Sequence, residues 1–205
     1  MSENYRYIDQ DFSYVDQNTG ILKNLADIND ANDLHFFESI VVSKRIQELF
    51  ENPIMIESIQ SLFKIHKHLF QDIYGWAGEK RNVEISKDGK QFFPTSLFDN
   101  AFNYIDLLIV DYKKTSKKNI KNLTEKLAEI LDYINYLHPF REGNGRAQRE
   151  FLRALSLEKD LILNINPADD KNVYDRYMNG TINSDIKILT ELILERISIK
   201  PLKNE

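Results

Sequence analysis

A stretch of nine residues, HPFREGNGR at positions 138–146, combines residue types that could bind and process phosphate groups. Pro139 should end one helix and a second should begin near Gly145 or Arg146, which places Gly143, Asn144 and Gly145 at a helix N-terminus. Unpaired N–H groups and the helix dipole favour an anion there. Glycine also permits the backbone angles that turn successive N–H groups inward. The stretch therefore predicts an anion-binding nest suited to phosphate.

Charged side chains beside this loop suit the same ligand. Arg146 and Arg149 are three positions apart, so they share one face of the second helix near its start, where an anion would balance them. A divalent cation that bridges Glu142 to phosphates would explain an acid among these basic groups. His138 can accept a proton near neutral pH. Each residue alone has a common structural explanation, but together they indicate a functional site.

The composition limits the class of protein. The 205 residues are 42% hydrophobic and 29% charged, which suits one large domain or two small ones with a real core. The net charge of -5 argues against general binding to nucleic acid. The absence of cysteine excludes disulfides and thiolate chemistry. We see no secretory signal and no apolar run near the ~20 residues that span a bilayer, and we expect a cytoplasmic protein without membrane contact.

Helical periodicity dominates the chain. Apolar residues recur at helical spacing from Leu34, after candidate N-caps at Asn32 and Asp33. An apolar stripe from Leu123 to Leu137 predicts a core helix. Further helices are expected at 55–74, 95–114, 146–161, 167–178 and 184–197. A short β-hairpin at about 80–94, with a turn at Asp88-Gly89, interrupts this pattern, whereas the lysine-rich KKTSKKNIK is expected to be a solvated loop.

The opening stretch resembles the signature of the Fic family, HxFx(D/E)GNGRxxR. The matching residues are His138, Phe140, Glu142, Gly143, Asn144, Gly145, Arg146 and Arg149. The segment IHKHLFQDIYGWAGEKRNVEISKDG, at positions 65–89, is similar to the family segment that leads into its flap hairpin. The resemblance covers roughly residues 30–180, and Ala147 is a small departure because threonine is common there.

The resemblance implies an all-α fold: a helical bundle of the Fic type with one short β-hairpin flap. Residues 1–30 are polar and turn-rich and are expected to form an N-terminal arm on the domain, and the resemblance assigns residues 31–180 to the Fic domain. Residues 181–205 would form a C-terminal helix and tail packed on the same domain.

The resemblance also implies a protein adenylyltransferase, which moves AMP from ATP to a Ser, Thr or Tyr hydroxyl. His138 would be the base, and Glu142 would bind Mg²⁺ against the phosphates. The α-phosphate would be held by Asn144 and by the backbone of the two glycines, Gly143 and Gly145. The β- and γ-phosphates would be held by Arg146 and Arg149. Phosphoryl-type transfer needs positioning and charge neutralisation more than covalent catalysis, which agrees with these residues.

The hairpin would bind the target protein by adding a target strand to its edge. The flap residues are Val83, Glu84, Ile85, Lys87, Gly89, Phe92 and Phe93. Phe92 and Phe93 would either flank the target residue or pack the hairpin on the bundle. His66 and His68 are not expected to bind a metal, because residues two apart on a helix diverge. Trp76 should belong to the core beneath the flap.

Regulation and alternative activities follow from the same comparison. Fic proteins are often inhibited by a glutamate in the motif (S/T)xxxE(G/N), and no Ser or Thr here has a Glu four residues on. Either a separate small antitoxin supplies that glutamate, or the enzyme is not inhibited, or the last helix carries a divergent form of the motif; we favour the antitoxin. An uninhibited transferase would be toxic to its own cell, so we expect a toxin, or an effector delivered into another cell. A Doc-like protein kinase is the first alternative, against which Gly145 argues because that branch usually has lysine there. The second is a non-enzymatic nucleotide-binding module, which would fit better if His138 or Glu142 were missing.

Overall fold

A computed structural model describes residues 5–7, 12–87, 89–166 and 170–201, and the statements that follow concern those residues. The helices are α1 (Ala31–Glu51), α2 (Gln60–Phe70), α3 (Phe98–Lys114), α4 (Ile120–Leu137), α5 (Asn144–Leu157), α6 (Lys171–Asn183) and α7 (Ile186–Arg196). The strands are β1 (Tyr5–Tyr7), β2 (Ile85–Lys87), β3 (Lys90–Gln91), β4 (Leu161–Leu163) and β5 (Ile197–Ile199), and a 3-10 turn, η1, covers Thr95–Leu97.

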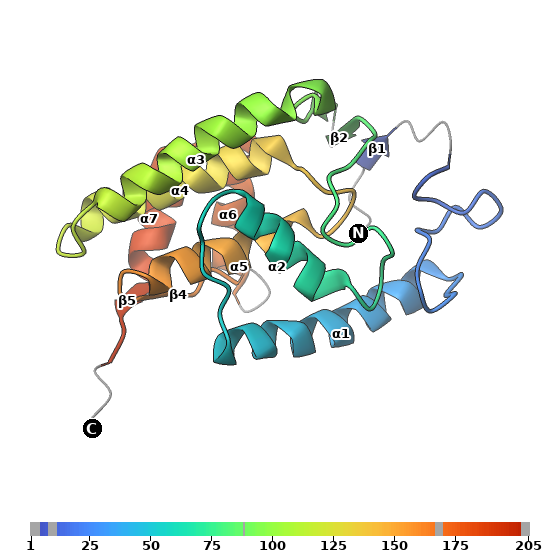
Figure 1. Ribbon diagram of the computed structural model, residues 1–205, viewed down its shortest axis with the longest axis horizontal. Coiled ribbons are helices and arrows are strands. Elements are labelled where there is room, and N and C mark those ends of the chain that lie inside the picture. Colours follow the sequence, from blue (N-terminus) through green and yellow to red (C-terminus); the bar gives the residue numbers. More distant parts are fainter. Residues whose placement is uncertain (1–4, 8–11, 88, 167–169, 202–205) are drawn as a thin grey trace.

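Helix α4 is the centre of the bundle (Figure 1). It packs against α3, α5 and α7, while α2 lies between α1 and α5. Its predicted apolar stripe is buried: Leu123, Leu127, Ile130, Ile134 and Leu137 are each at most 1% exposed. This burial confirms α4 as the core helix, and the expected helical bundle with one short hairpin is confirmed with it.

The hairpin of β2 and β3 gains a third strand from the N-terminal part of the chain. Strand β1 pairs antiparallel with β2, with Arg6 opposite Ser86 and Tyr7 opposite Ile85. The sheet order is therefore β1-β2-β3, and one edge of β2 is already occupied by this chain. The sequence did not predict this pairing, nor the short antiparallel pair of β4 and β5. Asp88 of the expected turn lies outside the described residues.

Several helix ends differ from their expected positions. Asp30 is the N-cap of α1, and its carboxylate accepts hydrogen bonds from the backbone N–H groups of Asn32 and Asp33. The predicted caps were therefore wrong, because Asn32 and Asp33 are donors in the first turn. Helix α5 ends at Leu157 rather than near residue 161, since Leu161–Leu163 forms β4. The division expected after residue 180 falls inside α6. None of the described helices combines the length and apolar composition that crossing a membrane requires.

Candidate active site

The loop between α4 and α5 depends on two residues with positive φ. His138 is the C-cap of α4 at φ 44°, and Gly143 is the N-cap of α5 at φ 80°. A Cβ atom on Gly143 would lie only 2.3 Å from Cζ of Phe70. Glycine is thus required here both for its backbone conformation and for the closeness of the Phe70 ring. The predicted glycine-dependent helix start is present, but α5 begins at Asn144, one or two residues earlier than expected.

Asn144 closes this loop with its side chain. Its Oδ1 accepts a hydrogen bond from the backbone N–H of Phe140 at 3.0 Å, and its Nδ2 donates to the Phe140 carbonyl at 2.8 Å. Phe140 is fully buried, so its ring anchors the loop in the core. The side chain of Asn144 therefore shapes the nest, and its amide already has partners in the protein.

His66 of α2 supports the loop from below. The backbone N–H of Gly78 donates to Nδ1 of His66 at 2.9 Å, so the ring proton lies on Nε2, which donates to the Glu142 carbonyl at 2.9 Å. The ring stacks on Phe140 with 3.7 Å between centroids. Burial lowers the pKa of His66 to about 3. His66 is thus a neutral structural residue, and the described residues contain no cluster of three metal-ligating side chains.

His138 lies at the mouth of the loop with a defined tautomer. Its Nδ1 lies 3.1 Å from the Asn135 carbonyl and must carry the proton, so Nε2 is the ring nitrogen able to accept one. The ring of Phe92 stacks on it at 3.9 Å between centroids. Burial lowers the pKa of His138 to about 3, although the hydrogen bond to Asn135 acts in the opposite direction. His138 is therefore neutral at physiological pH, as a general base must be.

Arg81 joins the flap to this loop. It is 1% exposed, and its guanidinium donates to the carbonyl oxygens of His138, Val83 and Phe93 at 2.8, 2.6 and 2.6 Å. Its backbone N–H also donates to the Pro139 carbonyl at 2.7 Å. A single buried side chain thus fixes both ends of the hairpin against the residue expected to act as base.

The predicted flap residues differ in their surroundings, and only some of them face the pocket. Lys87 and Phe92 line the pocket, whereas Val83 and Ile85 are buried under the hairpin. Phe93 packs edge-to-face on Tyr136, so it holds the hairpin on the bundle. Glu84 accepts hydrogen bonds from the Thr95 backbone and hydroxyl and from Arg81, and Gly89 has φ 81° with open space around it. Trp76 packs against the buried cluster beneath the flap, as expected.

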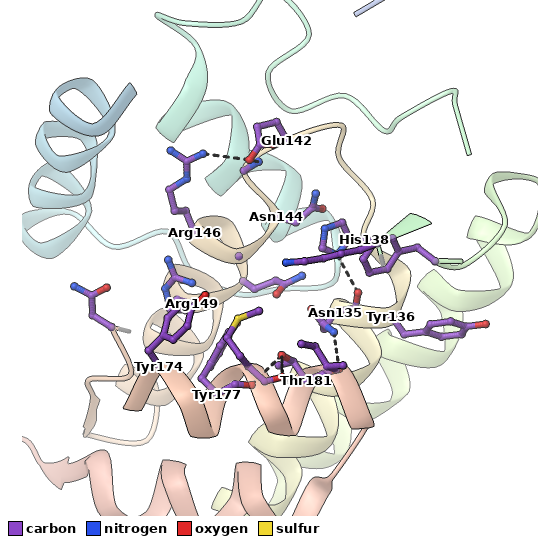
Figure 2. Close-up of a pocket in the computed structure, with 18 of the residues that line it drawn as sticks. Asn135, Tyr136, His138, Glu142, Asn144, Arg146, Arg149, Tyr174, Tyr177 and Thr181 are labelled. Atoms are coloured by element: carbon purple, nitrogen blue, oxygen red, sulfur yellow. Dashed lines mark hydrogen bonds and ion pairs between the residues drawn. The ribbon is translucent and has the colours of Figure 1, made fainter. Parts of the chain in front are cut away.

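The two arginines of the motif have different surroundings. Arg146 forms ion pairs with Glu38 of α1 at 3.0 Å and with Glu142 at 3.4 Å. Arg149 lies over the Tyr177 ring at 5.8 Å, and a Cβ on Gly145 would lie 3.2 Å from its Nη1. Figure 2 shows Arg149 directed into the pocket and Arg146 toward Glu142. At the start of α5, the guanidinium of Arg146 is thus paired with two carboxylates, whereas that of Arg149 faces the pocket.

A cavity of about 930 Å³ brings these residues together. Its walls come from α1, the flap, the α4–α5 loop and α6, and it contains His138, Glu142, Arg146 and Arg149 (Figure 2). This volume suits a nucleotide-sized ligand. One carboxylate oxygen of Glu142 accepts a hydrogen bond from the Gly143 N–H at 2.8 Å, and the side chain remains about a third exposed. A cation at Glu142 would therefore need further oxygen ligands from a bound substrate.

Sequence reasoning missed three residues of the site. Glu38 belongs to α1, more than a hundred positions from the motif, and no local pattern marks it. His66 was considered only as a metal ligand, and Arg81 was quoted only within the 65–89 segment, without a role of its own. A buried arginine in the loop before β2 has no distinctive spacing, so only the tertiary structure shows its hydrogen bonds.

Comparison with known proteins agrees with this geometry. The model of the Fic/DOC family matches residues 57–156. The chain is 34% identical over 146 residues to protein adenylyltransferase VbhT of Bartonella schoenbuchensis, covering 71% of this chain and 30% of that protein. It is 32% identical over 139 residues to probable protein adenylyltransferase y4lH of Sinorhizobium fredii, covering 67% of this chain and 71% of the relative.

A solved structure shows the same fold. The BepC protein of Bartonella tribocorum, determined with bound AMPPNP, superposes with a TM-score of 0.81 at 18% identity. The superposition covers 93% of this chain and 98% of that one. The helical fold expected from the sequence is therefore that of Fic domains.

Proposed function

Because this chain belongs to the Fic/DOC family, we propose that it is a protein adenylyltransferase that transfers AMP from ATP to a Ser, Thr or Tyr hydroxyl of a target protein. The observation that carries the proposal is one cavity in which His138, with Nε2 as the proton-accepting nitrogen, faces a glycine-shaped helix start and Arg149. A base, an anion-binding helix end and a cation are what nucleotidyl transfer from a triphosphate requires. The relatives named protein adenylyltransferases support the same reaction.

In the proposed reaction, the target hydroxyl attacks the α-phosphorus of ATP and its proton passes to Nε2 of His138. The bond to the β-phosphate breaks, and pyrophosphate leaves. The N–H groups at the start of α5, around Gly143 and Gly145, would stabilise the α-phosphate, within the loop shape that Asn144 maintains. Arg146 and Arg149 would hold the outer phosphates, and Glu142 would bind the Mg²⁺ that accompanies them.

The wall formed by α6 suits the nucleoside. Tyr174, Tyr177 and Met178 line the cavity beside Arg149, and aromatic and thioether surfaces favour a planar base. Thr181 and Asn135 provide polar groups on the same side of the cavity. We assign the nucleoside to this part of the cavity because the charges that phosphates need come from Glu142, Arg146 and Arg149, at the start of α5.

The target protein would add a strand to the flap, and β3 is the edge that the described chain leaves unpaired. Strand β1 already pairs with β2, so a target strand must use Lys90–Gln91 or displace β1. Phe92 stacks on His138 and would flank the hydroxyl-bearing residue. Phe93 is engaged with Tyr136 and would not contact the target.

A separate antitoxin remains our proposal for control of the enzyme. A glutamate supplied by such a partner would pair with Arg149, which projects into the cavity and has no carboxylate partner among the described ion pairs. The protein would then act as a toxin in its own cytoplasm or as an effector in another cell.

Label transfer tests the function. The purified chain, with Mg²⁺ and cell lysate, would receive ATP labelled at the α- or the γ-phosphate. We expect protein labelling from the α-label only, which His138→Ala abolishes and His68→Ala, a control histidine on α2 that contacts the Arg45 carbonyl, does not. Labelling from the γ-label only would make the protein a kinase. Labelling from neither, with nucleotide bound, would favour the non-enzymatic module.

A further inference from the structure

Helix α1 contributes a carboxylate to the candidate site from outside the residues that match the family model. Glu38 is 5% exposed although it is a glutamate on an outer helix. Its Oε2 lies 3.0 Å from Nη1 of Arg146, and its Oε1 accepts a hydrogen bond from the hydroxyl of Tyr74. Buried carboxylates are rare unless they are paired and hydrogen-bonded, and this one is both.

The two carboxylates on Arg146 differ in how firmly they are held. Glu38 is buried and anchored by Tyr74, which is itself 2% exposed. Glu142 contacts Nη2 at the longer distance of 3.4 Å, and its side chain is 35% exposed. The Phe70 ring covers one face of the guanidinium at 4.7 Å. Arg146 is therefore fixed on the α1 side and on the Phe70 side, whereas its contact with Glu142 can be exchanged.

The electrostatics agree with a permanent pair. Burial alone would lower the pKa of Arg146, but Glu38 and Glu142 outweigh it and raise this pKa above its ordinary value. Burial, followed by the charge of Glu38, raises the pKa of Tyr74, so the hydroxyl keeps its proton and remains a donor to the carboxylate. A carboxylate so enclosed has no solvent-exposed position to move into when an anion arrives.

We propose that Glu38 is a positioning residue, which holds the guanidinium of Arg146 so that its remaining N–H groups meet the outer phosphates of a nucleoside triphosphate. This inference rests on the proposed function, which assigns Arg146 to those phosphates. Arginine loses considerable rotamer freedom when it binds a ligand, and a guanidinium that is already fixed loses less. Glu38 thus favours triphosphates over AMP, because AMP has no phosphate at that position.

A buried carboxylate beside a phosphate site has a competing effect, because its charge repels the phosphates and occupies a donor. If that effect dominated, removing the charge of Glu38 would tighten the binding of ATP. Positioning predicts the opposite sign. In Glu38→Gln an NH2 group, which only donates, replaces one of the two oxygens that now accept separately from Tyr74 and Arg146. The guanidinium therefore loses its charged anchor while the side-chain volume is kept.

Calorimetric binding of ATP and of AMP, with Mg²⁺, tests this role. All proteins would carry His138→Ala to prevent turnover. We expect Glu38→Gln to weaken ATP binding about tenfold, as for the loss of a charge-assisted hydrogen bond, and to leave AMP binding unchanged. Tyr74→Phe should weaken ATP binding less, in the same direction. Glu48→Gln, which removes a charge that is about a third exposed from the same helix, should change neither affinity.

The outcomes separate the two proposals. Equal or tighter ATP binding by Glu38→Gln, or equal losses for ATP and AMP, overturns the positioning role while the proposed function stands. If the protein that carries only His138→Ala does not bind ATP, the proposed function itself is overturned. If Glu38→Gln does not fold, Tyr74→Phe decides the question, because it keeps both charges and loosens only the anchor. With His138 restored, Glu38→Gln should raise KM for ATP and keep kcat, which general destabilisation would not do.

Discussion

Gly143 is the position at which the structure tolerates a side chain least. Replacing it with alanine places a Cβ in the left-handed region at φ 80°, 2.3 Å from Cζ of Phe70. Phe70 is fully buried, so its ring has little room to move away. Gly143→Ala should therefore destabilise the protein through both backbone strain and overpacking.

The two contributions can be separated with a second glycine. A left-handed non-glycine residue costs roughly 1–2 kcal/mol, and overpacking a tight site adds about 1–3 kcal/mol. Gly20 has a similar φ of 70° but open space around it, so Gly20→Ala should show the backbone cost alone. Both variants change the unfolded chain equally. The difference between them, about 1–3 kcal/mol, is the contribution of the Phe70 contact.

Urea unfolding followed by circular dichroism would measure both variants. Gly143→Ala should also recover part of its loss in combination with Phe70→Leu, whose smaller side chain makes room for the new methyl group. If Gly143→Ala were no less stable than Gly20→Ala, the proximity of the Phe70 ring would not constrain this position. An additive double variant would lead to the same conclusion.

Three further predictions concern protons and the flap. Because burial lowers the pKa of His138 to about 3, kcat/KM for label transfer should stay level from pH 7 to pH 5, and a fall with midpoint near 6.5 would contradict this. Burial also lowers the pKa of His66 to about 3, below its unfolded value, so its stabilising contribution is complete above pH 6.5 and is lost as pH falls. Between pH 7 and pH 5 the free energy of unfolding should fall by about 2 kcal/mol more for the protein than for His66→Gln, whose amide can keep both hydrogen bonds. Equal falls, measured by urea titration at the two pH values, would refute this prediction. Deleting residues 1–11 frees the β2 edge and should lower the apparent KM for the target but not for ATP; an unchanged target KM would show that β1 does not compete.

The fold was predictable where the signal is local. The stripe on α4 and the turn residues of the hairpin depend on neighbours a few positions away, and both were recognised. The pairing of β1 with β2 joins segments about eighty positions apart, and three residues carry too little pattern to reveal it. The cap of α1 was placed two or three residues late because Asp30, Asn32 and Asp33 are all suitable cap residues, and only backbone angles distinguish them.

The candidate site divides in the same way. His138, Glu142, the glycines and the two arginines lie within twelve positions, so their proximity follows from the sequence itself. The tautomers and the hydrogen-bond and ion-pair partners of these residues do not follow from the sequence. The tautomer of His138 depends on the Asn135 carbonyl, and the different surroundings of Arg146 and Arg149 depend on α1 and α6. Sequence alone treated the two arginines as equivalent.

The loop between α4 and α5 is held in place by contacts from three parts of the chain. Phe70 and His66 of α2 press on it from one side, and Arg81 ties its start to the flap. These supports all lie within residues 57–156, the part that matches the family model. The third support, Glu38, lies outside that part, yet it contacts Arg146 directly. A fragment that began at residue 57 would keep the glycine-shaped nest and His138 but would lose Glu38, the buried carboxylate that contacts Arg146. Helix α1 is therefore part of the site, because it supplies the buried carboxylate that pairs with Arg146.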